Sequence, residues 1–323
     1  MLSVSATQIE INLTAAIVAI EGLTPLILAT RGEDGELVGL PSGPFDPRNH
    51  RTLDMGLRSW VQDQTGLGVG YAEQLYTFGD RGRHMHTGDA GPHIVSVGYL
   101  ALTRQPEEDG SLTDAGARFR PWYDYFPWED WRTGRPPILN HAIMPLLTQW
   151  AKADAGIRLG MSRKSRLRFA FGDDETWDEE KVLDRYELLY EAGLVEEAAR
   201  DGREAALART DRPKLGSAMR FDHRRILATA MGRLRSKLKY RPVVFEMMPD
   251  EFTLTELQRT VEAISGRHLH KQNFRRLVEA GALVEPTGET SIATGGRPAQ
   301  LFRFRREVVA ERPAAGLRLG VRG

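Results

Sequence analysis

The segment over residues 252–304 constrains the fold more than any other part of this 323-residue chain. Thr253 can cap a helix, and Glu256, three residues later, completes a capping box. The apolar residues that follow recur at helical spacing, namely Leu254, Leu257, Val261 and Ile264. Gly266 then ends the pattern. The segment therefore begins with a helix that has one apolar side.

A second predicted helix, over residues 271–280, has two different sides. Phe274, Leu277 and Val278 share the apolar side. The polar side carries Lys271, Gln272, Asn273, Arg275 and Arg276. Arg, Gln and Asn can bond base edges in the major groove of DNA, and Lys can bind phosphates. Gly281 stands where a left-handed helix cap is expected.

Two short strands, over residues 283–285 and 301–304, are predicted after this helix, with residues 294–298 in the loop between them. Helix, turn, basic helix and two-stranded wing together predict a DNA-binding winged helix-turn-helix. The residues expected at the DNA are Thr253, Thr255, Arg259, Lys271, Gln272, Asn273, Arg275, Arg276, Thr294, Gly296 and Arg297. The alternative is an ordinary helical hairpin with a solvated basic face.

Charge is unevenly distributed along the chain. Residues 209–323 hold 23 Lys and Arg against 12 Asp and Glu, whereas the preceding residues hold 21 against 32. This asymmetry predicts that only the C-terminal part contacts a polyanion. The absence of cysteine excludes disulfides and thiolate metal sites. The sequence shows no secretion signal and no apolar run near ~18 residues, so we expect a cytoplasmic protein without membrane spans.

The length predicts two domains with a connector between them. We expect an N-terminal domain over residues 1–155, a helical connector or dimerisation segment over 156–210, and a DNA-binding domain over 211–310. The sequence TDRPKLGS, residues 210–217, reads as a linker. The predicted fold class is α+β.

The predicted N-terminal domain begins with two paired strands, over residues 9–20 and 25–30, near the edge of a mixed sheet. A helix is expected over residues 52–64, with Leu53, Leu57 and Val61 on its buried side. Further strands end near residue 80 and span residues 94–102. A helix is predicted over residues 138–153.

Of four later segments, the first three allow more than one interpretation. The aromatic run over residues 122–131 can stack bases, but we favour packing. The basic run over residues 158–168 either contacts a phosphate backbone or is a solvated connector. The acidic helical residues 176–200 fit a dimer interface or packing against the N-terminal domain. The last segment, a helix over residues 221–239, is predicted to support the winged helix.

In this supporting helix, Asp222 is the expected cap. A buried stripe is predicted from Leu227, Ala230, Leu234 and Leu238. Six basic residues are expected on the outer surface and are candidates for phosphate contacts, namely Arg224, Arg225, Arg233, Arg235, Lys237 and Lys239.

Residues 40–67 resemble a Nudix box, the loop-helix-loop motif whose helix carries clustered glutamates. The scaffold positions match at Leu40-Pro41, Gly43, Val61 and Gly66-Leu67. Of the three glutamate positions, only Asp63 is acidic, and the other two are Trp60 and Gln64. Nudix hydrolases hold Mg²⁺ with such carboxylates. The resemblance therefore implies a Nudix-like α/β/α sandwich in which pyrophosphate hydrolysis is lost.

A nucleotide pocket is the expected remainder of this domain. Arg81 and Arg83 beside Phe78 can hold phosphate and stack an adenine, unless these arginines are merely solvated loop residues. The full set expected at an effector is Arg31, Arg58, Trp60, Asp63, Phe78, Arg81 and Arg83. A metal site at His84, His86 and His93 is an alternative that matches no established zinc spacing, so we predict no bound metal.

A Nudix-like domain with a degenerate box followed by a winged helix resembles the Nudix-related regulators of NAD metabolism, the NrtR type and the related NadQ type. The motifs that carry this resemblance are FDHRRIL, FTLTELQ, KQNFRR, GGRPAQLFRF and LYTFGD. The long acidic helical segment favours the NadQ type.

The resemblance implies a repressor rather than an enzyme. A homodimer is expected to bind palindromic double-stranded operator DNA near NAD-synthesis genes. The expected effector is an adenine nucleotide, with ATP or NAD favoured and ADP-ribose possible, and no cofactor is expected. The competing hypotheses are a Nudix-type pyrophosphohydrolase with a divergent box, and a scaffold or RNA-binding module.

Overall fold

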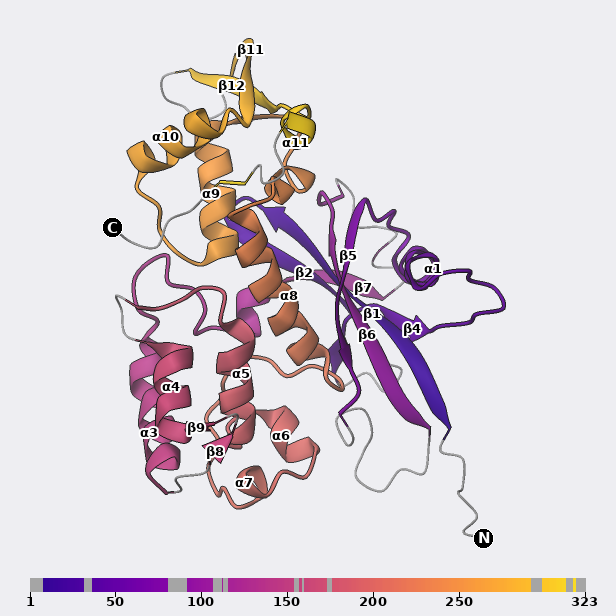
Figure 1. The fold of residues 1–323 in the computed structure, drawn as a ribbon, viewed down its shortest axis with the longest axis vertical. Helices are drawn as coiled ribbons and strands as arrows, with labels where there is room; N and C mark the ends of the chain where they lie inside the picture. Colours follow the sequence, from indigo (N-terminus) through magenta and orange to yellow (C-terminus); the bar gives the residue numbers. More distant parts are fainter. Residues whose placement is uncertain are drawn as a thin grey trace.

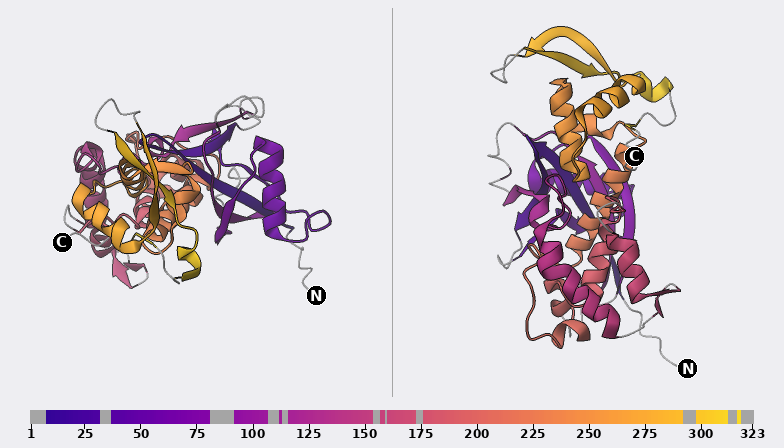
Figure 2. Two further views of the ribbon diagram at one scale, coloured as in Figure 1. Left: turned by 90° about the horizontal axis from the view of Figure 1, so that it is seen from above. Right: turned by 90° about the vertical axis from the view of Figure 1, so that its left-hand side faces the viewer.

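The computed structural model describes residues 8–31, 37–80, 92–106, 112, 116–153, 157–158, 160–172, 176–291, 298–311 and 316–317. Within these residues the fold is α+β, as predicted. A mixed sheet lies beside a helical layer, and a winged helix forms one end of the molecule, at the top of Figure 1. Helices α6 and α7 lie at the opposite end (Figures 1 and 2).

The N-terminal sheet is built on strand β1 (Ile9–Glu21). This strand pairs antiparallel with β2 (Thr24–Arg31) and parallel with β6 (His93–Leu102). The remaining strands are β3 (Val38–Gly39), β4 (Ser42–Pro44), β5 (Tyr71–Phe78) and β7 (Ala117–Pro121). The predicted pairing of the first two strands is confirmed. Their predicted place near the sheet edge is wrong for β1, because β6, far away in the sequence, occupies its second side.

Helix α1 (Leu53–Thr65) covers one face of this sheet. The Thr52 side chain caps it by accepting a hydrogen bond from the Met55 amide at 3.2 Å. Gly66 ends it with a left-handed φ of 69°. Leu57 and Val61 are buried against the sheet, as the apolar spacing predicted. The helix predicted over residues 52–64 is thus displaced by one residue at each end.

The other face of the sheet is covered by α8 (His223–Leu238). This helix also packs against α5 (Val182–Glu191) and α9 (Leu254–Ser265), so it lies between the sheet and the winged helix (Figure 1). Its predicted buried stripe is confirmed, since all four residues of that stripe are fully buried. Asp222 precedes the helix but makes no side-chain cap bond, contrary to the prediction. Its carboxylate instead pairs with Arg225 at 3.1 Å.

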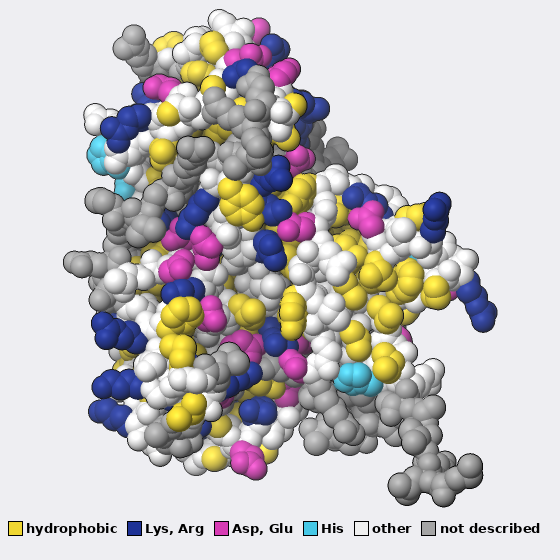
Figure 3. All heavy atoms as spheres, viewed as in Figure 1, with side chains coloured by type: hydrophobic (Ala, Val, Ile, Leu, Met, Phe, Trp, Pro, Cys, Tyr) yellow, Lys and Arg dark blue, Asp and Glu magenta, His cyan; other side chains and the backbone are white. Residues whose placement is uncertain are grey.

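The prediction of a basic outer surface on α8 is wrong, because only Arg233 of the six predicted basic residues is exposed. Arg224 and Arg235 are each 1 % exposed. Apart from Asp222, the acidic partners of the α8 cations and of Lys239 are Glu73, Asp80, Glu129, Glu179, Glu180, Glu187 and Glu197. All of these acids precede residue 209, so the acidic and basic parts of the chain neutralise each other along this helix. Figure 3 shows the resulting mixture of acidic and basic side chains across the middle of the molecule.

The helical layer beside the sheet follows the aromatic segment. Its elements are a π-helix (Leu139–Ile143), α3 (Met144–Ala153), β8 (Ile157–Arg158), β9 (Met161–Ser162), α4 (Arg163–Phe171), α5, α6 (Glu196–Arg200) and α7 (Glu204–Leu207). Within the acidic segment over residues 176–200 the chain forms two separate helices, α5 and α6. In the basic run, Arg166 pairs with Glu191 at 2.6 Å and Arg163 lies over Trp150. These two arginines therefore serve the fold.

The aromatic segment packs into the main hydrophobic core, which includes the short helix η1 (Trp122–Asp124). Trp122, Tyr125, Phe126 and Trp128 are each at most 1 % exposed. The prediction of packing rather than base stacking is confirmed for these four rings.

The C-terminal part forms the predicted winged helix. Its elements are η3 (Val243–Glu246), β10 (Glu251–Thr253), α9, α10 (Lys271–Gly281), β11 (Val284–Ser291), β12 (Ala299–Phe304) and α11 (Val308–Glu311). The strands form a sheet in the order β10-β12-β11. The capping box and the Gly266 end of α9 are confirmed. The left-handed cap of α10 is Ala282, with φ 45°, so the prediction of Gly281 is wrong by one residue. None of the helices that the structure describes has the length and apolar character needed to span a membrane.

Candidate DNA-binding surface and nucleotide site

Helix α10 turns its polar side outward. Phe274 is 1 % exposed and Val278 is fully buried, so these two residues attach the helix to the domain. The exposed residues are Lys271, Gln272, Asn273, Arg275, Arg276, Glu279 and Ala280. The two-sided character predicted for this helix is therefore confirmed, and all five predicted reading residues share its solvent-facing side.

Within that surface, Arg276 donates to the Asn273 side-chain oxygen at 3.1 Å. Among the described residues, Lys271, Gln272 and Arg275 have no hydrogen-bond or ion-pair partner, so their polar groups are available to a ligand. Glu279 was not considered in the sequence analysis, and its negative charge would repel a phosphate. The positive part of the surface is thus the first half of α10.

Two histidines next to α10 were missed by the sequence analysis. His268 is exposed and lies 3.1 Å from the carboxylate of Glu262, and His270 is exposed at the N-cap position without a side-chain cap bond. Their place beside the first turn of the helix was not marked by any motif. Only the position of the turn in the structure shows that both histidines lie beside α10.

The residues predicted at α9 differ in exposure. Thr253 is 5 % exposed, and its hydroxyl is engaged with Glu256, accepting from the amide at 3.2 Å. Thr255 is half-buried and Arg259 is exposed. Arg259 is therefore the accessible member of this group, while Thr253 has a capping role.

The predicted wing residues Thr294, Gly296 and Arg297 lie outside the described residues, as do Arg81 and Arg83. The described part of the wing adds one basic residue that the sequence analysis did not select. Arg303 on β12 is largely exposed and pairs with Glu285 on β11 at 2.6 Å.

In the degenerate Nudix box, the two replaced glutamate positions hold α1 to strand β4. The Trp60 indole donates to the Pro44 carbonyl at 2.7 Å and lies directly over Gly43, where no β-carbon would fit. Gln64 makes two bonds to the Ser42 backbone, donating to its carbonyl at 2.7 Å and accepting from its amide at 3.2 Å. An amide side chain can make both bonds because it carries a donor and an acceptor, which an ionised glutamate does not.

Asp63 is the remaining acidic residue of the box. It is exposed, and its carboxylate lies 3.5 Å from the Ser59 hydroxyl. The described residues contain no group of three or more His, Asp or Glu side chains positioned to hold a metal ion. One carboxylate supplies too few oxygen ligands for a catalytic Mg²⁺ cluster.

The structure brings together only some of the residues predicted at the nucleotide. Arg58, Trp60 and Asp63 lie on α1, where Arg58 pairs with Asp54 at 2.8 Å and also donates to the Val69 carbonyl. Arg31 is exposed at the end of β2. Phe78 lies on the opposite face of the sheet from α1.

Phe78 is 1 % exposed and belongs to the core beneath α8, with the Arg225 guanidinium 5.3 Å from its ring centre. The predicted grouping of Phe78 with Trp60 therefore fails in this conformation. Side chains alternate between the two faces of a strand, and the sequence did not reveal which face Phe78 takes.

Comparison with known proteins agrees with this geometry. Residues 244–304 match the family described as the NrtR DNA-binding winged helix domain. The chain is 46 % identical over 84 residues to the ADPR responsive transcriptional repressor NtrR of Acinetobacter baylyi. That match covers 26 % of this chain and 33 % of the relative, so it spans about a third of the relative's length.

Two solved structures share the fold over most of the chain. Shewanella oneidensis NrtR, crystallised with a 27mer DNA, is 18 % identical, with a TM-score of 0.55 and coverage of 93 % of this chain and 95 % of that one. A MutT/nudix family protein from Enterococcus faecalis is 16 % identical, with a TM-score of 0.52 and coverage of 93 % and 89 %. The Nudix-like and winged-helix folds and the resemblance to NrtR-type regulators are thus confirmed. The preference for the NadQ type stays a prediction.

Proposed function

We propose that this chain is a sequence-specific DNA-binding transcriptional repressor whose Nudix-like part binds an adenine nucleotide. Its targets would be NAD-synthesis genes, as the resemblance to NrtR-type regulators implies. Residues 156–210 would serve as the connector between the sensor part and the DNA-binding part.

The exposed surface of α10 is the observation that carries this proposal. Arg275 and Arg276 project from the same side as Lys271, Gln272 and Asn273, while Phe274 and Val278 fix the helix from behind. An α-helix fits the major groove, where arginine can bond guanine and Gln or Asn can bond adenine. The same helix lies within the residues that match a DNA-binding family.

The Nudix-like part acts in this proposal as a sensor without hydrolase activity. Two of its three metal-binding positions are occupied by Trp60 and Gln64, whose side chains bond to the backbone of β4. The carboxylate of Asp63 remains exposed on α1, 3.5 Å from the Ser59 hydroxyl. This surface is polar but lacks the negative charge that an Mg²⁺–diphosphate complex requires.

ADP-ribose is the first nucleotide to test, because the similar Acinetobacter baylyi repressor is described as ADPR responsive. ATP and NAD share its adenosine and phosphate groups and are the alternatives. In the proposed mechanism a homodimer binds a palindromic operator, with one α10 in each half-site about one helical turn apart. Bound nucleotide changes the relative orientation of the two helices and so changes operator affinity.

The test is a fluorescence-anisotropy titration of the full-length chain against duplexes taken upstream of NAD-synthesis genes. ADP-ribose, ATP and NAD are added separately. Specific binding that one nucleotide changes by at least ~5-fold is expected from an allosteric coupling of ordinary size. Binding that no nucleotide changes would contradict the sensor role.

A parallel assay distinguishes the repressor from the competing hydrolase. Phosphate-containing products from ADP-ribose with Mg²⁺ are measured for the wild-type chain and for Asp63→Asn. No turnover is expected from either protein. Magnesium-dependent turnover that Asp63→Asn abolishes would establish an enzyme with a divergent box.

A further inference from the structure

The turn before α10 is held by residues from the N-terminal part of the chain. The Tyr123 hydroxyl donates to the Ala263 carbonyl at 2.7 Å. The Trp131 amide donates to the Gly266 carbonyl at 2.6 Å. Ala263 and Gly266 lie at the end of α9, so both bonds fix the segment that leads into the reading helix.

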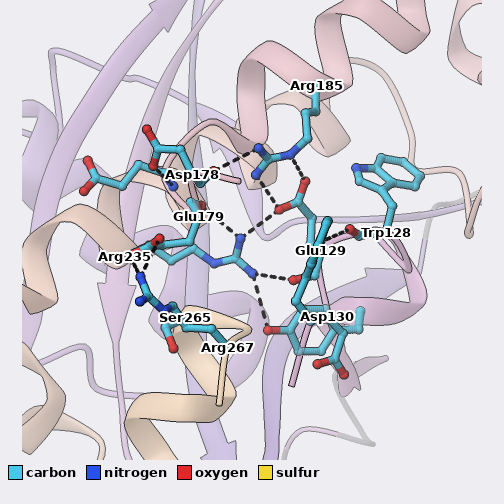
Figure 4. Close-up of polar contacts among 12 residues, drawn as sticks. Trp128, Glu129, Asp130, Asp178, Glu179, Arg185, Arg235, Ser265 and Arg267 are labelled. Atoms are coloured by element: carbon cyan, nitrogen blue, oxygen red, sulfur yellow. Dashed lines mark hydrogen bonds and ion pairs between the residues drawn. The ribbon is translucent and has the colours of Figure 1, made fainter. Parts of the chain in front are cut away.

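Arg235 of α8 connects these groups. Its guanidinium donates to the Ile264 carbonyl at 2.9 Å and to the Glu129 carboxylate at 2.8 Å. It also donates to the Glu129 carbonyl at 3.1 Å and contacts the Tyr123 hydroxyl at 3.3 Å. One side chain thus joins α9, α8 and the aromatic segment (Figure 4).

The Glu129 carboxylate lies between two guanidinium groups. Arg185 of α5 donates to its two oxygens at 2.6 and 2.7 Å. Glu129, Arg185 and Arg235 are each at most 1 % exposed. Burial acts to raise the pKa of Glu129, but Arg185 and Arg235 together hold it below its usual value, so the carboxylate stays charged.

A second ion pair holds the same turn to the connector. Arg267 lies 3.1 Å from Glu179, and Lys239 lies 3.1 Å from the same carboxylate. A buried network of this kind has few alternative arrangements, because any displaced charge loses its partners. The α9 end of the turn, up to Arg267, is therefore firmly attached to the aromatic segment, α8 and the connector.

The aromatic segment also connects this turn to the N-terminal sheet. Strand β7 pairs with β2, with Pro121 opposite Leu26, and continues directly into Trp122 and Tyr123. Arg132 donates to the Leu23 carbonyl at 2.5 Å, at the turn that begins β2. A displacement of β2 therefore has a short, packed route to α10.

We infer that Tyr123 and Glu129 are positioning residues for DNA recognition: they set the orientation of α10 from the sensor part without contacting DNA. The same contacts transmit the effect of a nucleotide from the sheet to the reading helix. This inference rests on the proposed function for its DNA readout.

The test compares Tyr123→Phe with Tyr190→Phe in the full-length chain. Each change removes one hydroxyl from a hydrogen-bonded tyrosine, but the Tyr190 hydroxyl bonds Asp201 at 2.9 Å in the connector, away from α9 and α10. The DNA probe is the tightest duplex that the wild-type chain selects from a random library. Operator Kd, its change with ADP-ribose, thermal stability and amide hydrogen exchange over residues 266–271 are measured.

Tyr123→Phe is expected to weaken operator binding, or to alter the ADP-ribose response, by roughly fivefold or more. It should also speed amide exchange over residues 266–271. Tyr190→Phe should lower thermal stability by a similar amount but leave operator Kd, the ADP-ribose response and this exchange unchanged. A Tyr123→Phe protein with wild-type Kd, nucleotide response and exchange would overturn the inference.

If the wild-type chain selects no duplex from the library, the proposed function itself is contradicted. The exchange measurement then still tests whether Tyr123 holds the turn before α10. Faster exchange over residues 266–271 in Tyr123→Phe alone would support the attachment of the turn, and equal exchange in both variants would refute it.

Discussion

Replacement of Glu129 by glutamine should destabilise the protein far more than the same change at Glu191. Glu129 accepts at least three hydrogen bonds from Arg185 and Arg235, and all three side chains are almost completely buried. Removal of one partner from a buried ion pair costs about 3–5 kcal/mol, because the remaining charge has no water to solvate it. Two guanidinium groups lose their counter-ion here, which places the cost at the upper end of that range.

The matched control is Glu191→Gln. Glu191 also pairs with two arginines, Arg166 through bonds of 2.6 and 2.8 Å and Arg158 at 3.4 Å, but Glu191 and Arg166 remain 18 % and 14 % exposed and Arg158 is 59 % exposed. Water can replace part of that interaction, so a cost of about 0–1 kcal/mol is expected.

Thermal unfolding of the two variants provides the assay. At about 2–4 °C per kcal/mol, Glu129→Gln should lower Tm by roughly 10–20 °C and Glu191→Gln by no more than about 4 °C. Equal Tm values for the two variants would show that the buried network does not hold the two parts of the chain together. The reasoning about its role at α10 would then fail as well.

Three further predictions concern pH, the reading helix and the degenerate box. The pKa values of Glu129 and Glu179 are lowered in the folded protein, because nearby cations outweigh the opposing effect of burial. Their contribution to stability is therefore present above pH ~4.5 and lost as pH falls through the folded values, so Tm measured against pH should fall below about pH 4.5 and stay level above it. Arg275→Ala should weaken operator binding by about 1–3 kcal/mol if Arg275 reads a base, and an unchanged anisotropy titration would exclude it from the reading set. Gly43→Ala would place a methyl group against the Trp60 indole ring on α1 and should cost about 1–3 kcal/mol of stability. In the control, Gly68→Ala, the added methyl group meets no atom within 4 Å. Equal stability of the two variants in chemical denaturation would refute the close packing of Trp60 on Gly43.

The features that the sequence predicted well depend on neighbouring residues. Thr253 and Gly266 delimit α9 as predicted, because caps act within one turn. The two sides of α10 followed from helical spacing in the same way. For these elements, a short stretch of sequence contains the physical cause.

The incorrect predictions involve partners that are far away in the sequence. The basic residues of α8 appeared to form a solvated surface, but Arg235 is buried by Glu129, over 100 residues earlier in the chain. Charged residues are usually exposed to solvent unless they are paired, and the sequence of α8 does not show which acidic residues pair with its cations. The central place of β1 and the orientation of Phe78 were missed for the same reason, since both depend on strand order.

The candidate site was predictable in part. The composition of α10 was sufficient to select five residues that share its exposed side, whereas His268 and His270 became visible only with the turn in place. At the Nudix box, the sequence showed the loss of two glutamates. It did not show that Trp60 and Gln64 had acquired bonds to β4, because those bonds depend on how the loop folds back.

A competition titration tests the central claim, sequence-specific DNA binding through α10, most directly. The full-length chain is bound to a labelled duplex from upstream of NAD-synthesis genes, and unlabelled duplexes of the same or of scrambled sequence are added. The account predicts that the scrambled duplex competes at least ~10³-fold less well, the difference typical of specific recognition. Equal competition by both duplexes would contradict it, because a surface that binds only phosphates cannot distinguish them.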